Sequence, residues 1–200
     1  EKEISFLANK RGISIFCLQH GIMTLNPKFE KYHSIMPVLP SNNSKMLVWG
    51  KIMEDYLLEH KIDSKQIAIV GSPRHDRFFN STKNYSTNNI LLATTGAMNI
   101  SADTCTTNSQ LKYDAFIKKI YDIIKQLPDK KLIIRPHPSP VLTSNVSNLI
   151  KNIDDKLPVM KNENLFDLIQ ESELVITFNN STICLDALSM KNLLYHYRPM

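Results

Sequence analysis

Short apolar runs alternate with amphipathic segments along the second half of this 200-residue chain. Apolar residues recur at helical spacing in 113–127, 146–153, 181–190 and the stretch that follows Asn164, a candidate helix cap. Continuous apolar runs lie between these segments and predict strands at 90–94, 131–136, 157–160, 173–178 and 192–197. Apolar strands that alternate with helices predict a parallel sheet with both faces buried.

The first half repeats this alternation less completely. A helix-like start and a helix at 51–60 accompany predicted strands at 13–19, 45–50 and 66–71. After the last strand, Ser72 is a candidate cap for a helix with Pro73 at its first position. The polar stretch 80–89 lacks apolar periodicity and predicts a hinge.

We therefore predict an α/β fold of two parallel-sheet units, residues 1–83 and 84–200. The chain begins without a methionine and stops directly after an apolar run. We expect the first unit to be incomplete and the second to be truncated at its C-terminus.

The composition narrows the class of protein. The chain is 42% hydrophobic and 22% charged with a net charge of +5, which fits a mildly basic globular protein suited to anionic ligands or membrane surfaces. Its basic residues form no stripe interleaved with aromatics, so we expect no nucleic-acid partner. Cys17, Cys105 and Cys184 are widely spaced and form no metal-binding motif. We expect a reducing, cytoplasmic compartment, no metal and no membrane-spanning segment.

Polar groups follow the ends of five predicted strands. In open parallel sheets, ligands bind beyond the carboxyl ends of the strands. We therefore expect these groups to face one cleft between the two units. They are Gln19-His20-Gly21, Gly71-Ser72-Pro73-Arg74, Thr94-Thr95-Gly96, Arg135-Pro136-His137-Pro138 and Asn179-Asn180-Ser181-Thr182.

Three of these groups are candidates for chemistry, each beside a structural alternative. His20 can exchange protons near neutral pH and is a candidate base for an attacking hydroxyl, or an interface histidine. Arg135 and His137, on a backbone stiffened by prolines, suit a diphosphate, although the prolines could simply end the strand. Residues 180–182 can hold phosphate at a helix start or act as ordinary caps.

Four segments in the same order resemble the GT-B superfamily of nucleotide-dependent transferases. They are "LQHGI…NPKF", "VGSPRHDRF", "LIIRPHP" and "LFDLIQESELVITFNNSTICLDAL". The likeness is greatest to the CDP-glycerol glycerophosphotransferases and related capsule or surface-polysaccharide glycosyltransferases, and it covers residues 11 to 198. It implies two Rossmann-like units, with acceptor-side residues in the first and the nucleotide donor bound by the second.

The resemblance implies a role for each matching residue. His20 resembles the catalytic histidine, and Arg135 and His137 resemble the donor-binding pair. Asn180, Ser181 and Thr182 stand at the phosphate-binding helix start, and Asp186 matches an acidic residue that contacts the ribose or supports the site. We place five further residues on the cleft or acceptor side: Gln19, Gly21, Ser72, Arg74 and Thr95.

The resemblance also implies the substrates. The donor is CDP/CMP- or UDP-linked and needs no cofactor, and the acceptor is a polysaccharide or a lipid-linked molecule at the inner face of the plasma membrane. The segments at 20–23 and 178–181 depart from the glycerophosphotransferase pattern, which favours a sugar donor over a polyol phosphate. Two alternatives stay open: an enzyme like the UDP-N-acetylglucosamine 2-epimerases, and a non-catalytic nucleotide-binding or scaffold domain.

Overall fold

The computed structural model describes residues 2–22, 40, 44–79, 87–94, 107–138, 140–178 and 181–197. Backbone contacts divide the chain into two compact units, residues 1–76 (unit 1) and 77–200 (unit 2). The sequence places the boundary at 83/84, in a stretch outside the described residues. That predicted division, with an acceptor role for one unit and a donor role for the other, stays a prediction.

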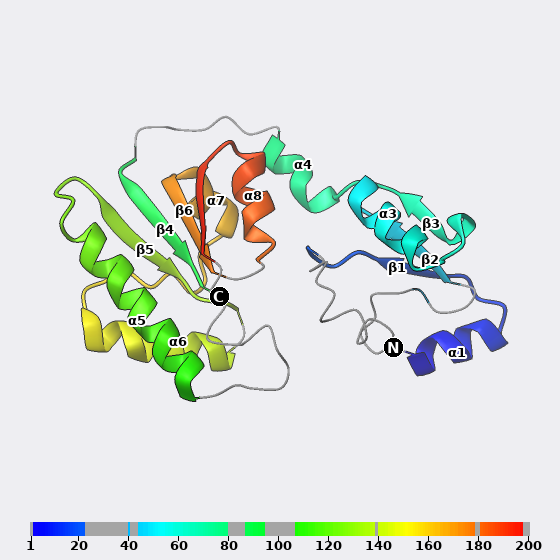
Figure 1. Cartoon of the computed structure of the whole chain (residues 1–200), viewed down its shortest axis with the longest axis horizontal. Coiled ribbons are helices and arrows are strands. Elements are labelled where there is room, and N and C mark those ends of the chain that lie inside the picture. Colours follow the sequence, from blue (N-terminus) through cyan, green and yellow to red (C-terminus); the bar gives the residue numbers. More distant parts are fainter. Residues whose placement is uncertain are drawn as a thin grey trace. The chain divides into compact units, whose positions relative to one another are not determined.

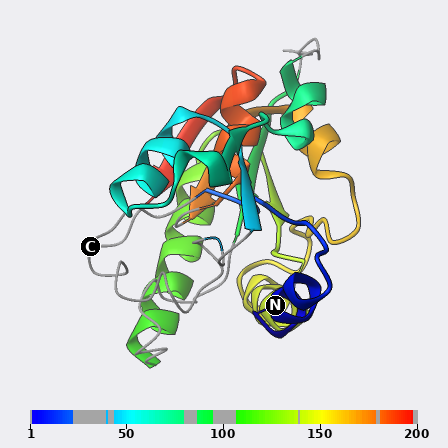
Figure 2. The ribbon, with the colours of Figure 1, turned by 90° about the vertical axis from the view of Figure 1, so that its right-hand side faces the viewer.

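Unit 1 contains a parallel sheet with strand order β1-β2-β3. Its elements are α1 (Lys2–Lys10), β1 (Ile15–Leu18), β2 (Ser44–Val48), α3 (Lys51–Glu59), the 3-10 helix η1 (Ser64–Gln66), β3 (Ile67–Ile69) and the start of α4 (Pro73–Phe79). Helix α3 covers one face of this sheet (Figure 1, Figure 2). The apolar core between them contains Met46, Val48, Met53, Tyr56 and Leu57.

Unit 2 contains a second parallel sheet, with strand order β5-β4-β6-β7. Its strands are β4 (Asn89–Ala93), β5 (Lys131–Arg135), β6 (Ser172–Phe178) and β7 (Leu193–Tyr197). Its helices are α5 (Thr107–Ile124), α6 (Pro140–Ile153), α7 (Leu165–Gln170) and α8 (Ile183–Ser189). Both sheets are parallel and alternate with helices, so the predicted α/β class is confirmed.

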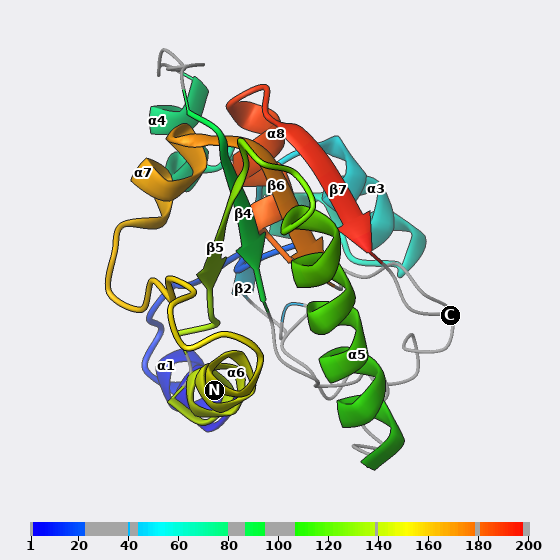
Figure 3. The same cartoon turned by 90° about the vertical axis from the view of Figure 1, so that its left-hand side faces the viewer.

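Successive residues of β4 divide the core of unit 2 into two layers. Ile90 and Leu92 face α5 and α6, whereas Leu91 packs with α7, α8 and Phe78 of α4. This alternation follows from the twofold period of a strand and buries the sheet on both faces (Figure 3). The arrangement leaves the ends of the strands, rather than the faces of the sheet, as the place for polar chemistry.

Most predicted elements appear, and the main differences concern two helix starts and one predicted strand. Helix α5 begins six residues before the expected start at 113, and α6 begins at Pro140 rather than at 146. Proline at a first helical position lacks only an N–H that would have no partner within the helix. The run expected as a strand at 157–160 makes a single parallel bridge, Ile134 to Val159, along the free edge of β5.

Candidate functional site

The topology of unit 2 defines one preferred edge for a ligand. The chain leaves β4 toward β5 on one side and leaves β6 toward β7 on the other. The order of the strands therefore reverses between β4 and β6, and ligands of open α/β sheets bind outside the carboxyl ends of the strands at such a point. Ala93 is in register with both Arg135 and Thr177, so these strands end side by side.

Two residues that follow β6 and one that follows β4 lie at this edge. Ser181 is buried, and its hydroxyl oxygen accepts a hydrogen bond from the Ile183 amide at 3.3 Å. Thr182 is half-buried and makes no side-chain cap to α8. Thr94 is only 2% exposed, and its hydroxyl has no hydrogen-bond partner among the residues that the structure describes. Ser181, Thr182 and Thr94 thus bring three hydroxyl groups to the ends of adjacent strands.

Asp186 lies in the first turn of α8 and is fully buried. Of the two roles implied by the resemblance, this burial favours support of the site over contact with a ribose. The two remaining site residues predicted near this edge, Asn180 and Thr95, lie outside the described residues.

Arg135 and His137 leave the end of β5 in different environments. The half-buried Arg135 donates hydrogen bonds from Nη1 to the carbonyl oxygens of Met160, at 2.8 Å, and Lys161. His137 is exposed and follows the buried Pro136. Arg135 therefore holds the turn after Val159 against β5, whereas His137 is accessible to a ligand.

We expect Arg135→Lys to destabilise the protein even when no ligand is bound. Lysine retains the charge but lacks the rigid, planar guanidinium whose Nη1 donates to both carbonyls. Hydrogen bonds to charged groups contribute about 1.5–3 kcal/mol, so we expect a loss of about 1–3 kcal/mol in the free energy of unfolding, measured by denaturant titration. The exposed Arg11→Lys is the matched control, with a change within about 0.5 kcal/mol. Unchanged stability in Arg135→Lys would show that the two carbonyl contacts are dispensable.

In unit 1, Gln19 is a structural residue of the strand end. It is 9% exposed; its Oε1 accepts from the Trp49 amide at 2.9 Å, and its Nε2 donates to the Gly21 carbonyl at 3.0 Å. The backbone N–H of Gln19 donates to the Leu47 carbonyl at 2.9 Å. Gln19 thus ties the turn after β1 to the end of β2 and fixes the backbone that carries the exposed His20.

The segment after β3 contains a serine–histidine pair. Gly71 adopts a φ of 74°, a left-handed conformation that glycine accepts readily, and turns the chain into α4. Ser72 Oγ lies 2.6 Å from Nδ1 of the buried His75. Arg74 is exposed. His75 was not among the predicted site residues, although the predicted helix start, with Ser72 as cap and Pro73 at the first position, already places His75 at the third helical position, near Ser72.

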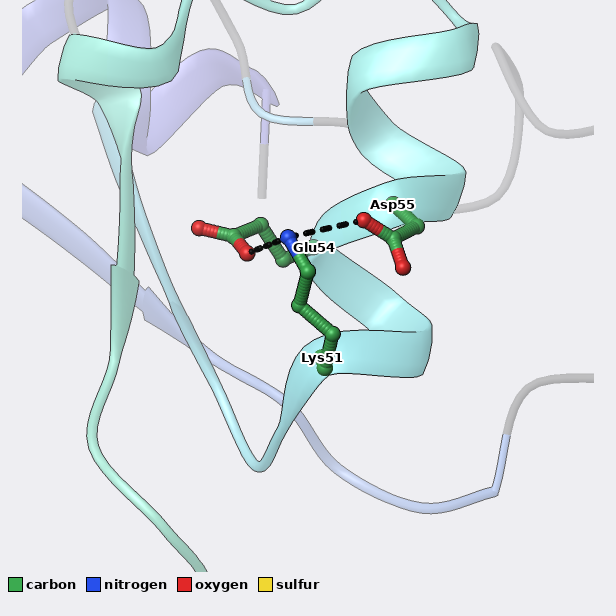
Figure 4. A network of polar contacts seen from close by, with 3 residues as sticks. All are labelled: Lys51, Glu54 and Asp55. Carbon is green, nitrogen blue, oxygen red and sulfur yellow. Dashed lines mark hydrogen bonds and ion pairs between the residues drawn. The ribbon is translucent and has the colours of Figure 1, made fainter.

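The charge near the end of β2 is balanced locally. Lys51 opens α3, and its Nζ lies 2.7 Å from Glu54 and 2.9 Å from Asp55 (Figure 4). The hydrogen bond to Glu54, followed by that to Asp55, raises the pKa of Lys51 above its ordinary value. This cation is therefore engaged with two carboxylates, and the strand end there carries no excess positive charge from Lys51.

Each unit is thus a parallel α/β domain with polar side chains at the carboxyl edge of its sheet. The sequence matches the family described as LIC12162 family transferase over residues 1–192, and the chain belongs to that family of transferases. No curated protein matches the chain.

Two further findings concern the described residues alone. None of their helices is long and apolar enough to cross a membrane. None of their histidine, cysteine, aspartate and glutamate side chains form a group of three or more that could hold a metal ion. The predicted cleft between the units stays a prediction.

Proposed function

We propose that this chain is a GT-B-type transferase that moves a glycosyl or polyol-phosphate group from a nucleotide-activated donor to a cell-surface polysaccharide acceptor. Membership of a transferase family supports the general reaction. The observation that supports the proposal further is the strand order β5-β4-β6-β7, which reverses between β4 and β6, since ligands of open α/β sheets bind outside the carboxyl ends of the strands at such a point. Ser181 follows β6 at that edge, and His137 follows the nearby β5.

In this proposal, unit 2 binds the CDP/CMP- or UDP-linked donor. His137, Asn180, Ser181 and Thr182 donate hydrogen bonds to the diphosphate, which offsets the negative charge that develops on the leaving nucleotide. Arg135 adds positive charge at the same edge while it holds the turn at Met160. Asp186 supports the start of α8 from within the core.

Unit 1 acts on the acceptor. A ring nitrogen of His20 takes the proton of an acceptor hydroxyl. The hydroxyl oxygen attacks the transferred group, and the bond between that group and the nucleotide phosphate breaks. Gln19 and Gly21 hold the turn that carries His20, and Ser72 and Arg74 follow β3 at the same edge of the sheet. The proposed acceptor is a polysaccharide or its lipid-linked precursor, met in the cytoplasm at the inner face of the plasma membrane.

A thermal-shift panel of CMP, CDP, UDP, GDP and dTDP tests this proposal. One nucleotide present at a hundredfold excess over its Kd should stabilise the chain by about 2.7 kcal/mol. His137→Ala should lose this response. His60→Ala should keep it, because His60 ends α3 and its Nδ1 contacts the Tyr56 carbonyl at 2.8 Å. If none of the five nucleotides raises the melting temperature, the proposed donor site is wrong.

A further inference from the structure

A second set of side chains lies at the carboxyl edge of unit 1, at the ends of β2 and β3. These strands are in register at Val48 and Ile69, and the amide of Val70 donates to Val48 at 2.9 Å. Trp49 and Ser72 therefore follow neighbouring strands at one edge. Parallel α/β sheets bind ligands at this edge.

His75 joins these two residues. Its Nδ1 lies 2.6 Å from Ser72 Oγ, and its ring meets the ring of Trp49 edge-on, with centroids 5.3 Å apart and an interplanar angle of 77°. The imidazole is only 5% exposed. It therefore acts through its neighbours rather than on a ligand directly. Gln19 also fixes the backbone of Trp49, because its Oε1 accepts a hydrogen bond from the Trp49 amide.

Trp49 and Ser72, the two residues that His75 contacts, are both half-buried, so part of each residue reaches the surface. A serine hydroxyl has one donor and two acceptor sites, and the bond to His75 uses one of them. The Ser72 hydroxyl thus retains hydrogen-bonding capacity for a ligand. An indole ring offers an apolar face, and ligand sites combine such faces with a few fixed polar groups.

The charges around this edge favour a neutral ligand. Lys51 is engaged by Glu54 and Asp55. The charged residues within six positions of Trp49 or Ser72 in sequence sum to 4 − 3 = +1: Lys45, Lys51, Arg74 and Arg77 against Glu54, Asp55 and Asp76. Since Lys51 is already engaged by two carboxylates, these residues provide no concentrated positive charge for a phosphate group. A sugar ring, with an apolar C–H face and a rim of hydroxyls, matches an aromatic face beside a hydroxyl.

We propose that Trp49 and Ser72, held in place by His75, form a binding site for a neutral sugar ring on unit 1. Trp49 packs against the C–H face of the ring, and Ser72 exchanges a hydrogen bond with a ring hydroxyl. His75 is a positioning residue. Identification of this sugar with the acceptor rests on the proposed function, whereas the binding itself does not.

Trp49 is the single tryptophan of the chain, so its fluorescence reports on this site. The full chain is titrated with the methyl glycosides of glucose, galactose and N-acetylglucosamine. At least one glycoside should give a saturable change in Trp49 fluorescence. The fluorescence of N-acetyltryptophanamide under the same conditions should not change. Ser72→Ala and His75→Phe should each weaken binding about tenfold or more, which corresponds to about 1.4 kcal/mol. His75→Asn, whose amide can replace Nδ1, should restore most of it.

Circular dichroism checks that each variant is folded. If His75→Phe does not fold, the glycoside affinities of Ser72→Ala and His75→Asn still test the inference. The inference is overturned if no glycoside gives a saturable change, or if Ser72→Ala binds as tightly as the unaltered chain. Nucleotide thermal shifts in the same variants should be unchanged, since nucleotide binding is assigned to unit 2. Glycoside binding without nucleotide binding would defeat the proposed donor and leave this site standing. Nucleotide binding without glycoside binding would contradict the sugar site on unit 1 alone.

Discussion

His20→Ala is expected to lower the rate of group transfer by about 10²- to 10⁴-fold, the usual contribution of general acid–base catalysis. The imidazole is exposed at the end of β1, on a backbone that Gln19 holds through Gly21 and Trp49. Removing the ring takes away the proposed proton acceptor and changes no residue of unit 2. Single-turnover kinetics should show the lost rate, and nucleotide thermal shifts should stay as they were.

His60→Ala is the matched control for this change. His60 also belongs to unit 1, but it lies at the far end of α3, the helix that starts at the carboxyl edge of the sheet. It should leave the transfer rate within about twofold, because its effect is limited to local stability. A transfer rate in His20→Ala equal to that of the unaltered chain would remove His20 from the mechanism.

Gln19→Leu should give the largest loss of stability among the site variants. Leucine fills a similar volume but leaves the Trp49 amide and the Gly21 carbonyl without their side-chain partner. Each buried group left unsatisfied costs about 1–3 kcal/mol, and water can reach the half-buried strand end, so we expect a loss of about 2–3 kcal/mol. Denaturant unfolding measures it. Transfer should also slow, because the turn that carries His20 loses its anchor.

Gln66→Leu provides the comparison within the same unit. Gln66 makes one such bond, from Nε2 to the Ser44 carbonyl at 3.2 Å. Its loss should cost about 1 kcal/mol and should not alter transfer. Equal destabilisation by both substitutions, with transfer unaffected in Gln19→Leu, would mean that Gln19 serves packing alone and does not position His20.

The strands of both sheets could be predicted from the sequence because buried parallel strands appear as continuous apolar runs. The runs around Ile90, Ile133 and Val175 are separated by helices and form strands as predicted, whereas the shorter run at 157–160 makes only one bridge. Helix starts were predicted less well. The first turn of α5, Thr107 to Gln110, is polar and carries no apolar periodicity, and α6 begins at Pro140, six residues before the apolar pattern from which its start was predicted.

For the site residues, positions could be predicted from the sequence, whereas contact partners could not. That His20 and His137 would follow strand ends could be predicted, since a strand and the residue after it are adjacent in sequence. The partners of Gln19 and Arg135 could not, because they lie 30 and 25 residues away along the chain. Burial of Asp186 likewise depends on how α8 packs against the sheet. Local patterns thus predicted where polar residues would stand, and tertiary contacts decide which of them hold the site and which face a ligand.

The most direct measurement is release of free nucleotide from activated donors, with and without acceptor. The full chain is incubated with CDP-glycerol, UDP-glucose or UDP-N-acetylglucosamine, and a polysaccharide extract is added to half of each reaction. We predict that one donor yields its nucleotide much faster with the extract, that His20→Ala slows this release by about 10²- to 10⁴-fold, and that His137→Ala abolishes it. Conversion of UDP-N-acetylglucosamine to its manno epimer without acceptor-dependent release, or no acceptor-dependent release from any donor, would contradict the transferase account.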